Sequence, residues 1–566
     1  MKNLLPLLLI VGSFPVLLLA QSPPSASKID SVFAAWNAPG QPGAAVGVVY
    51  QGKLIYAKGF GEADVETGAP ITPQTIFHVA SVSKQFTAYA IAMLAQQGKL
   101  SLDDEVQKYI PELADFGHKI TIRHLIHHIS GLRDQWNLLV MAGWQMEDVI
   151  TKENILGLVK RQRELNFLPG AEYTYSNTGY TLLGEIVARV TKQPFPEWMK
   201  QNIFAPLGMK STLFYDDHQR IVKGRAYSFY KAGGAESYKK NVLSYANAGA
   251  TSLFTTVEDL ALWLGNFRHP TVGDQATLKQ VLERGRLNKG DTISYAFALD
   301  HGKHKVLSYI GHSGVDAGYR SYLCYFPKED YGFIVLSNQA EFNPVKKAFD
   351  VADLYLASQF KAPPLLAPPV AAFKEQKIAP ALFDAYVGDY ELRPGFVLSF
   401  KREGERFLTQ ATGQGQVEIF PYSDTTFFLK VVDAQITFHR QKDGKTDRLT
   451  LHQNGNQPGR RVVPYTITNE GLKEYTGKYY SPELETFYTI KLEKDKLQLV
   501  HVHHGETTLK PVSKDKLQVP WWFFQSIDMV RDANNTITGL RVSNGRVRNL
   551  WFKRIPADFG EEMPKK

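Results

Sequence analysis

The sequence predicts a mixed α/β domain followed by two small all-β domains, and three observations carry this prediction. The chain has 566 residues, more than a single hydrophobic core usually holds. A proline-rich run, KAPPLLAPPV over residues 361–370, excludes both helix and sheet interior. Helical patterns alternate with strand-like runs such as AAVGVVYQGKLIYAKG before that run, and they almost vanish after it.

The first twenty residues have the layout of a secretory signal peptide. Lys2 precedes an apolar run that ends at Ala20, and no other stretch is long and apolar enough to span a bilayer. A retained membrane anchor is the alternative, which two prolines, a glycine and a serine within the run disfavour. We therefore expect residues 1–20 to be removed from an exported protein, periplasmic or extracellular, with no stable membrane span afterwards.

Charge and cysteine content narrow the class of protein further. The formal net charge is +9, from 65 basic and 56 acidic residues without a basic block, so no nucleic-acid partner is expected. The one cysteine, Cys324, cannot form an intramolecular disulfide. It lies in the apolar run RSYLCYF, and we expect a buried structural thiol.

The proline-rich run sets the domain boundaries. We assign residues 21–360 to the α/β domain, 361–378 to a linker, 379–465 to a first β domain and 466–558 to a second. The phrase AYVGDY near the start of the first β domain is echoed by EYTGKY near the start of the second. Each phrase opens a series of short alternating strands with turn signals, which predicts a small barrel or sandwich.

The residues suited to chemistry begin with Ser81-Val82-Ser83-Lys84. One helical turn places the hydroxyl and the amine on the same face, and an amine with a lowered pKa can take the serine proton. Ser81 follows an extended segment, TIFHVA, and opens an amphipathic helical run to Gln97, just before Gly98. Other Ser-x-x-Lys matches lack this setting; they begin at Ser25, Ser228, Ser237, Ser358 and Ser513.

A second element is Tyr175-Ser176-Asn177. It follows the turn LPG and precedes the helical pattern TGYTLLGEIVARV. A tyrosine in this place can move a proton, and an amide can position both lysine and substrate. The competing match, Tyr245-Ala246-Asn247, has a Gly/Ala/Ser-rich stretch and no such helix behind it. Tyr175 and Asn177 are therefore preferred.

A third element is His312-Ser313-Gly314, followed by Val315. It lies in a strand-and-turn context, and a glycine at a strand edge lets a substrate backbone pair closely. The same pattern at His503-His504-Gly505 falls in the C-terminal β region and is interpreted as a chance match.

In this order the three motifs resemble those of the class C β-lactamase and penicillin-binding family, including its esterases and D-aminopeptidases. The resemblance covers about residues 28–360 and extends to TIRHLIHHISGL, LPGAEYTYSNTGYTLLGEI and GATSLFTTVEDLALW. It implies a β-lactamase/transpeptidase-like domain with an antiparallel sheet flanked by helices. The two β domains resemble the lipocalin-like domains attached to some D-aminopeptidases, which suggests that they roof the active site or serve localisation.

The resemblance also implies a mechanism. Ser81 is acylated, Lys84 and Tyr175 pass its proton to the leaving group, and water then releases the acyl group. The backbone N–H groups of Ser81 and Val315 form an oxyanion hole. Further contacts with a small-molecule or peptide substrate are implied for Asn177, His312, Ser313 and Gly314.

One departure from the family bears on the substrate. Many β-lactamases and DD-peptidases of this type carry Lys-Thr-Gly where this chain has His312-Ser313-Gly314, and an imidazole is only partly charged near pH 7. This favours a peptidase, aminopeptidase or esterase, acting on esters, amides, or D-amino-acid or cell-wall-derived peptides. The alternatives are a true class C β-lactamase and a non-catalytic cell-envelope peptide- or penicillin-binding protein.

No metal or cofactor is predicted. His124, His127 and His128 fall at helical spacing, but no carboxylate or cysteine is spaced to complete a metal site, so packing and hydrogen bonding are expected. The glycine-rich segments lack a phosphate-binding loop, and there is no Gly-x-Ser-x-Gly elbow. The aromatic run Trp521–Phe524 predicts core packing with an interdomain contact, a stacking platform for sugar or peptide being the alternative.

Overall fold

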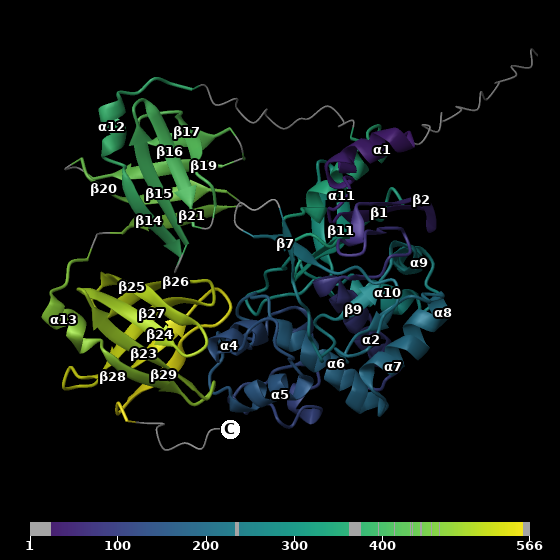
Figure 1. Ribbon diagram of the computed structural model, residues 1–566, viewed down its shortest axis with the longest axis horizontal. Coiled ribbons are helices and arrows are strands. Elements are labelled where there is room, and N and C mark those ends of the chain that lie inside the picture. Colours follow the sequence, from purple (N-terminus) through teal and green to yellow (C-terminus); the bar gives the residue numbers. More distant parts are fainter. Residues whose placement is uncertain are drawn as a thin grey trace, which may run out of the picture.

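The computed structural model describes residues 24–232, 237–360 and 375–558, except 394–395, 413, 431, 433, 442–443, 454 and 463–464. The predicted signal peptide lies outside these residues, as do positions 361–374 of the predicted linker. Figure 1 shows an α/β domain and two β-barrels. Within the described ranges, no helix is both long enough and apolar enough to cross a membrane.

A six-stranded antiparallel sheet lies at the centre of the α/β domain, which confirms the predicted fold class. The strand order is β10-β11-β12-β13-β1-β2, with bounds Asp300–His304, Leu307–Asp316, Tyr319–Phe326, Tyr331–Ser337, Ala44–Tyr50 and Lys53–Phe60. Side chains of β1 alternate between two cores, Val46 and Val48 in one, Ala45 and Val49 in the other. A strand covered on both faces is apolar throughout, as AAVGVVY is.

Helices cover both faces of this sheet. On one face, α1 (Ala26–Phe33) packs with α11 (Pro344–Tyr355). On the other, α9 (Val257–Arg268) contacts the sheet, and α2 (Ser83–Gln96) packs with α6 (Asn177–Thr191) and α10 (Gln275–Val281). The shorter helices are η1 (Ala34–Trp36), η2 (Ala80–Val82), η3 (Val106–Lys108), α3 (Ile122–Ile126), α4 (Gln135–Met141), α5 (Lys152–Arg161), α7 (Phe195–Met199), η4 (Lys200–Phe204) and α8 (Ala205–Leu207). The shorter strands are β3 (Glu62–Asp64), β4 (Ala69–Pro70), β5 (Phe77–His78), β6 (Leu213–Phe214), β7 (Phe229–Lys231), β8 (Tyr238–Lys240) and β9 (Leu253–Thr255).

The helix α2 is enclosed by the rest of the domain, because every residue from Ser83 to Leu94 is buried. The sequence pattern predicted an amphipathic helix that starts at Ser81, and the structure differs in both respects. The helix begins at Ser83, since Ala80–Val82 form a 3₁₀ turn, and α6 and α10 pack against it. An enclosed helix is a rigid support for the residues at its N-terminal end.

The C-terminal region forms two closed barrels of eight antiparallel strands, as predicted. The first holds β14 (Gly388–Arg393), β15 (Phe396–Glu403), β16 (Arg406–Ala411), β17 (Val417–Pro421), β18 (Thr426–Leu429), β19 (Gln435–Arg440), β20 (Thr446–His452) and β21 (Asn456–Arg461). The second holds β22 (Gly477–Ser481), β23 (Thr486–Glu493), β24 (Lys496–His501), β25 (Gly505–Ser513), β26 (Lys516–Trp521), β27 (Phe524–Arg531), β28 (Ile537–Ser543) and β29 (Leu550–Ile555). The short helices α12 (Pro380–Asp384) and α13 (Asn469–Glu474) precede them.

The repeated Tyr-x-Gly-x-Tyr phrase has the same role in both barrels. Its tyrosines are buried in the barrel cores; they are Tyr386, Tyr390, Tyr475 and Tyr479. Its glycine opens the first strand with a φ of +139° at Gly388 and +148° at Gly477. A Cβ at either position would also come close to an arginine side chain of the last strand, so both the backbone angle and the space favour glycine where the barrel closes.

The second barrel packs directly on the α/β domain, beside α4 and α5 in Figure 1. The buried apolar residues of the two bodies form one core. Arg133 is fully buried, and its Nη1 donates to Glu483 Oε2 of the barrel at 2.7 Å. The Tyr488 hydroxyl donates to the Met141 carbonyl at 2.8 Å. A common core with a buried ion pair makes these two bodies one packed unit.

Candidate active site

Ser81 lies in the tight turn η2 between β5 and α2. Ala80 before it has a left-handed φ of +48°, which is uncommon for a residue with a Cβ. Ser83 Oγ donates to Ala80 O at 2.5 Å and accepts from Leu253 N at 3.0 Å, so the turn is held against β9. The turn brings Ser81 to the wall of a cavity.

Lys84 follows Ser81 by one helical turn and is fully buried. Its Nζ lies 3.0 Å from Ser81 Oγ, 2.8 Å from Asn177 Oδ1 and 2.6 Å from Ala250 O. The amide and carbonyl oxygens can only accept hydrogen bonds. A neutral amine therefore gives its two hydrogens to Asn177 and Ala250, and its lone pair remains for the Ser81 hydroxyl.

The environment of Lys84 favours this neutral form. Burial lowers the pKa of Lys84 from 10.5 to about 7. The Asp134 carboxylate opposes that change, and the Arg546 guanidinium adds to it. At neutral pH about half of the Lys84 side chains are unprotonated, which is the condition for a general base at that pH.

Tyr175 lies beside the same amine, with Lys84 Nζ 5.0 Å from its ring centroid. Its ring packs on His128, whose Nδ1 accepts from Ser176 N at 3.1 Å. The Tyr175 hydroxyl is buried and has no hydrogen-bond partner in the described part of the chain. Burial raises the pKa of Tyr175, with the nearby Ser81 hydroxyl opposing, so the side chain is a neutral phenol at neutral pH.

Asn177, the first residue of α6, is held by Asp134. Its backbone N and its Nδ2 both donate to Asp134 Oδ2 at 2.8 Å, which turns the amide oxygen toward Lys84. The other carboxylate oxygen of Asp134 caps α4 by accepting from Trp136 N at 3.1 Å. Sequence reasoning did not identify Asp134. The available signal was an aspartate just before a helical run, a common N-cap.

The residues of the third motif, His312, Ser313, Gly314 and Val315, lie in β11, against η2. β10 pairs with β11 as far as Gly311, and beyond it no described strand pairs with that edge. This free edge is where the sequence predicts a substrate backbone. A Cβ at Gly314 would collide with the Val79 carbonyl and the Ser321 hydroxyl, so β11 can approach the Ser81 turn only with glycine there.

His312 is uncharged, which corrects the partial charge expected from its residue type. Its Nδ1 donates to Ser313 O at 2.6 Å, and its Nε2 accepts from the Tyr295 hydroxyl at 2.9 Å. Burial, reinforced by Lys84, lowers the pKa of His312 to about 4. The imidazole therefore offers no positive charge to a substrate at neutral pH.

These residues meet at a cavity of about 440 Å³. Six of the eight site residues predicted from the sequence line it: Ser81, Tyr175, Asn177, His312, Ser313 and Val315. Lys84 and Gly314 lie behind this wall, in contact with it. Much of the remaining wall is aromatic or acidic, from Trp136, Tyr173, Tyr245, Tyr295, Asp300 and Asp316.

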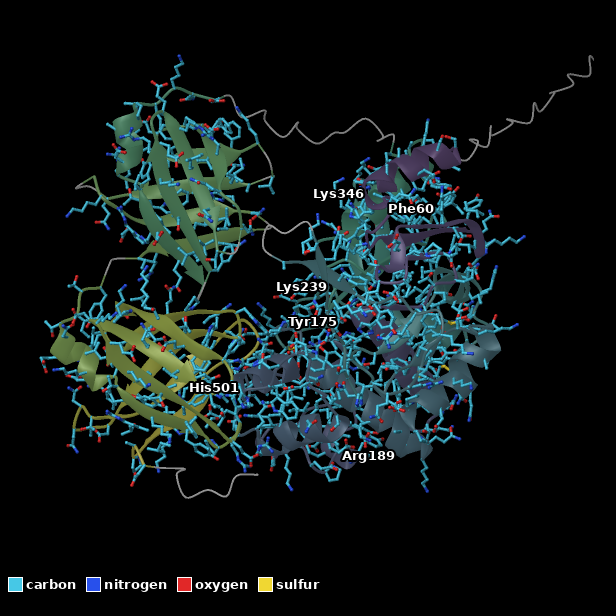
Figure 2. The ribbon with its side chains drawn as sticks, in the orientation of Figure 1. Phe60, Tyr175, Arg189, Lys239, Lys346 and His501 are labelled. Atoms are coloured by element: carbon cyan, nitrogen blue, oxygen red, sulfur yellow. The ribbon has the colours of Figure 1, made fainter. Side chains whose placement is uncertain are left out.

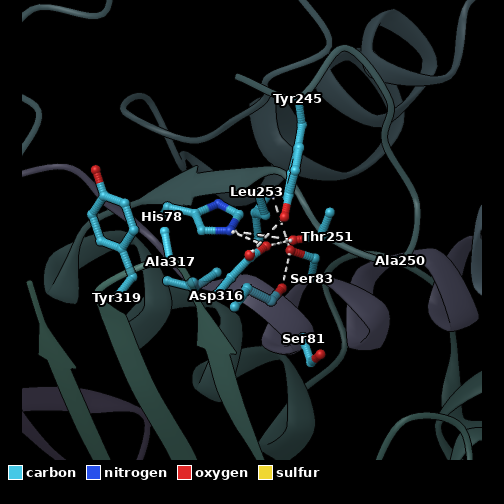
Figure 3. Close-up of polar contacts among 12 residues, drawn as sticks. His78, Ser81, Ser83, Tyr245, Ala250, Thr251, Leu253, Asp316, Ala317 and Tyr319 are labelled. Atoms are coloured by element: carbon cyan, nitrogen blue, oxygen red, sulfur yellow. Dashed lines mark hydrogen bonds and ion pairs between the residues drawn. The ribbon is translucent and has the colours of Figure 1, made fainter. Parts of the chain in front are cut away.

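Asp316, at the end of β11, anchors a polar network that sequence reasoning missed (Figure 3). Its Oδ2 accepts from Thr251 Oγ1 at 2.9 Å and lies 3.1 Å from His78 Nε2, and its Oδ1 accepts from the Tyr245 hydroxyl at 3.1 Å. Tyr245, from the competing Tyr-x-Asn match, also lines the cavity, but its hydroxyl donates to Asp316. The tyrosine beside Lys84 is Tyr175.

The second barrel completes the cavity wall. Arg546, between β28 and β29, and Trp522, between β26 and β27, both line the cavity. The Arg546 guanidinium lies 5.0 Å from the Tyr175 ring centroid. Figure 2 shows Tyr175 on the side of the α/β domain toward the second barrel, which carries His501. Sequence reasoning did not identify Arg546. It did predict that the aromatic run Trp521–Phe524, which holds Trp522, makes an interdomain contact.

The other histidines of the segment 124–128 and Cys324 serve packing and hydrogen bonding. His124 takes part in a capping box with Thr121, and the buried His127 ring packs on Phe297. Among the described residues, no group of three or more His, Cys, Asp or Glu is placed to hold a metal ion. Cys324 is buried, and burial raises the pKa of its thiol, as expected for a structural cysteine.

Family models match the α/β domain and the first barrel. The family model described as Beta-lactamase matches residues 29–357, and one described as a domain of unknown function (DUF3471) matches residues 373–461. Penicillin-binding protein 4* of Bacillus subtilis (strain 168) is 28% identical over 424 residues, which are 72% of this chain and 92% of that protein. Protein flp of Staphylococcus aureus (strain N315) is 30% identical over 305 residues, which are 52% of this chain and 59% of that protein.

Solved structures show the same fold at low identity. The octameric penicillin-binding protein homologue from Pyrococcus abyssi has a TM-score of 0.51 at 22% identity, covering 82% of this chain and 96% of that chain. The D-amino acid amidase from Ochrobactrum anthropi SV3 complexed with L-phenylalanine has a TM-score of 0.51 at 22% identity, covering 59% and 99%. Because the family match spans more than half of the sequence, the chain belongs to the Beta-lactamase family of serine hydrolases and penicillin-binding proteins.

Proposed function

We propose that the protein is a serine hydrolase that forms an acyl-enzyme on Ser81. The observation that carries this proposal is the Lys84 amine, whose two obligate acceptors leave its lone pair to the Ser81 hydroxyl at 3.0 Å. As Ser81 Oγ attacks a carbonyl carbon, Lys84 accepts the hydroxyl proton. The bond to the leaving group then breaks, and water hydrolyses the resulting ester.

Tyr175 is assigned the transfer of the proton to the leaving group. Its hydroxyl is buried, neutral and without a competing hydrogen bond, and its ring lies beside the Lys84 amine. Asn177 orients Lys84, and the backbone N–H groups of Ser81 and Val315 are assigned to the oxyanion hole. Both residues line the same cavity, on the turn η2 and on the neighbouring strand β11.

The substrates we propose are amides or esters, with D-amino-acid amides and peptides as the first to test. The names of two similar proteins, a penicillin-binding protein and a D-amino acid amidase, support that choice. The uncharged His312 argues against the lysine-based anchoring that many β-lactamases of this type use. We also propose an exported protein, on the ground of residues 1–20.

Intact-mass spectrometry tests the nucleophile. The purified protein is exposed to a fluorophosphonate and, separately, to a penicillin, each beside Ser81→Ala. We expect one adduct on the wild type that is absent from the variant. Absence of any adduct, or an adduct that persists in a folded Ser81→Ala protein, would overturn the proposal. N-terminal sequencing of the exported protein tests the signal peptide, with a start near Gln21 as the expected result.

A further inference from the structure

Positive charge is scarce around the cavity. Among the described residues that line it, Arg546 is the only lysine or arginine. Lys84 is buried behind the wall with its three contacts inside the protein, and His312 is uncharged. A negatively charged group on a bound molecule therefore has Arg546, from the second barrel, as its available cation.

The hydrogen-bond donors of the Arg546 side chain have no acceptor in the described part of the protein. Arg546 forms only a long ion pair with Asp134: Oδ2 lies 3.9 Å from Nη1, beyond hydrogen-bond range, and that oxygen already accepts two bonds from Asn177. The Arg546 side chain is 45% exposed. A guanidinium in this state presents a planar fork of donors that matches a carboxylate.

The loop that carries Arg546 is held from both domains. Asn544 Oδ1 accepts from Arg546 N at 2.7 Å, and Asn544 Nδ2 donates to Phe523 O at 2.5 Å, which ties this loop to the turn of Trp522. From the α/β domain, Asn166 Nδ2 donates to Arg546 O at 2.9 Å. A backbone fixed on both sides loses little freedom when the side chain binds a ligand.

We infer that Arg546 binds a carboxylate of the substrate, so that the second barrel determines specificity for the proposed hydrolase. The acidic residues of the wall are consistent with this position: Asp316 is bound by His78, Thr251 and Tyr245, and together with Asp300 it disfavours a carboxylate elsewhere in the cavity. The inference rests on the proposed function, because it concerns the substrate of the same site.

The test compares kcat/KM for two matched pairs of aryl esters. In one pair the acyl part carries a carboxylate or does not, as in 4-nitrophenyl glutarate and 4-nitrophenyl butyrate. In the other pair the leaving group differs in the same way, as in 3-carboxyphenyl butyrate and phenyl butyrate. We expect Arg546→Ala to lower the preference for the charged ester in at least one pair by about tenfold, equivalent to about 1.4 kcal/mol. The ratio within a pair cancels any effect of Arg546 on the chemistry of Lys84.

Arg548→Ala is the matched control. It removes the same charge from the same loop, but Arg548 pairs with Glu172 at 3.0 Å and does not line the cavity, so the preference is expected to stay within about twofold. Arg546→Lys is expected to restore part of the preference. If Arg546→Ala does not fold, Arg546→Gln replaces it in the same assay. In a separate measurement on the wild type, the preference for the charged ester is expected to fall as the salt concentration rises.

Two results would overturn the inference: an unchanged preference in both pairs for the folded Arg546 variant, or a wild type that hydrolyses only the uncharged esters. These outcomes differ from a failure of the proposed function. If Ser81→Ala keeps the wild-type ester hydrolysis, the nucleophile is wrong. If hydrolysis depends on Ser81 while the charge preference is insensitive to Arg546, only the carboxylate site is wrong.

Discussion

The pH dependence of Ser81 acylation tests the proton transfer from Ser81 to Lys84. Burial lowers the pKa of Lys84 to about 7, so the amine is free above that pH and protonated below it. The acylation rate should therefore rise with pH and level off above about 8. At pH 5 only about one hundredth of the Lys84 side chains are unprotonated, and we expect a rate about a hundredfold below the plateau.

The assay is the single-turnover release of 4-nitrophenol from 4-nitrophenyl butyrate between pH 5 and 9. Asp300 also lines the cavity, and burial raises its pKa to about 6, so Asp300→Asn serves as the control for this limb. The limb near pH 7 should persist in Asp300→Asn. Lys84→Arg, which stays protonated, should lose about 10² to 10⁴ in rate at every pH. A limb near pH 10, or one that disappears in Asp300→Asn, would refute the assignment of Lys84.

Three further predictions follow from the same contacts. Asp134→Asn keeps a cap for α4 but removes a carboxylate that raises the pKa of Lys84, so the acidic limb of the rate should move to lower pH in the assay above. Glu483→Ala removes the carboxylate that lies 2.7 Å from the fully buried Arg133 and leaves only the longer ion pair with Glu164 at 3.6 Å, so chemical denaturation should show a loss of about 3 kcal/mol. Trp522→Ala should raise KM for aromatic esters about fivefold and leave the free energy of unfolding within about 0.5 kcal/mol, because this side chain is 56% exposed at the cavity.

Local patterns were enough for the parts of the site that are close in sequence. Ser81 and Lys84 are one helical turn apart at the start of a helical pattern, and Tyr175 and Asn177 directly precede another, so spacing and flanking pattern together distinguished these residues from the other matches. The start of α2 was predicted two residues too early. A 3₁₀ turn and an α-helical turn have similar side-chain spacing, and the positive φ of Ala80 leaves no mark in the residue type.

Residues that act through distant contacts were not predictable in this way. Asp134 and Asp316 serve the site through hydrogen bonds to other segments, and either aspartate has the appearance of an ordinary polar residue in sequence. Arg133 is fully buried although arginine is usually exposed, since its partner Glu483 lies in another domain. The position of Arg546 depends on how the second barrel packs on the α/β domain, which no local pattern encodes.

The docking of the second barrel has a consequence for biosynthesis. Arg546 follows Ser81 by 465 positions (546 minus 81), so translation produces Ser81 long before it produces the last wall of the cavity. During that interval the α/β domain exposes the apolar surface that the barrel later covers, and its pocket lacks the side chains of Trp522 and Arg546. Under the proposed function, a nascent or truncated chain would have its nucleophile in an open site, and the proposed selectivity for a carboxylate would arise only when the barrel folds onto that site.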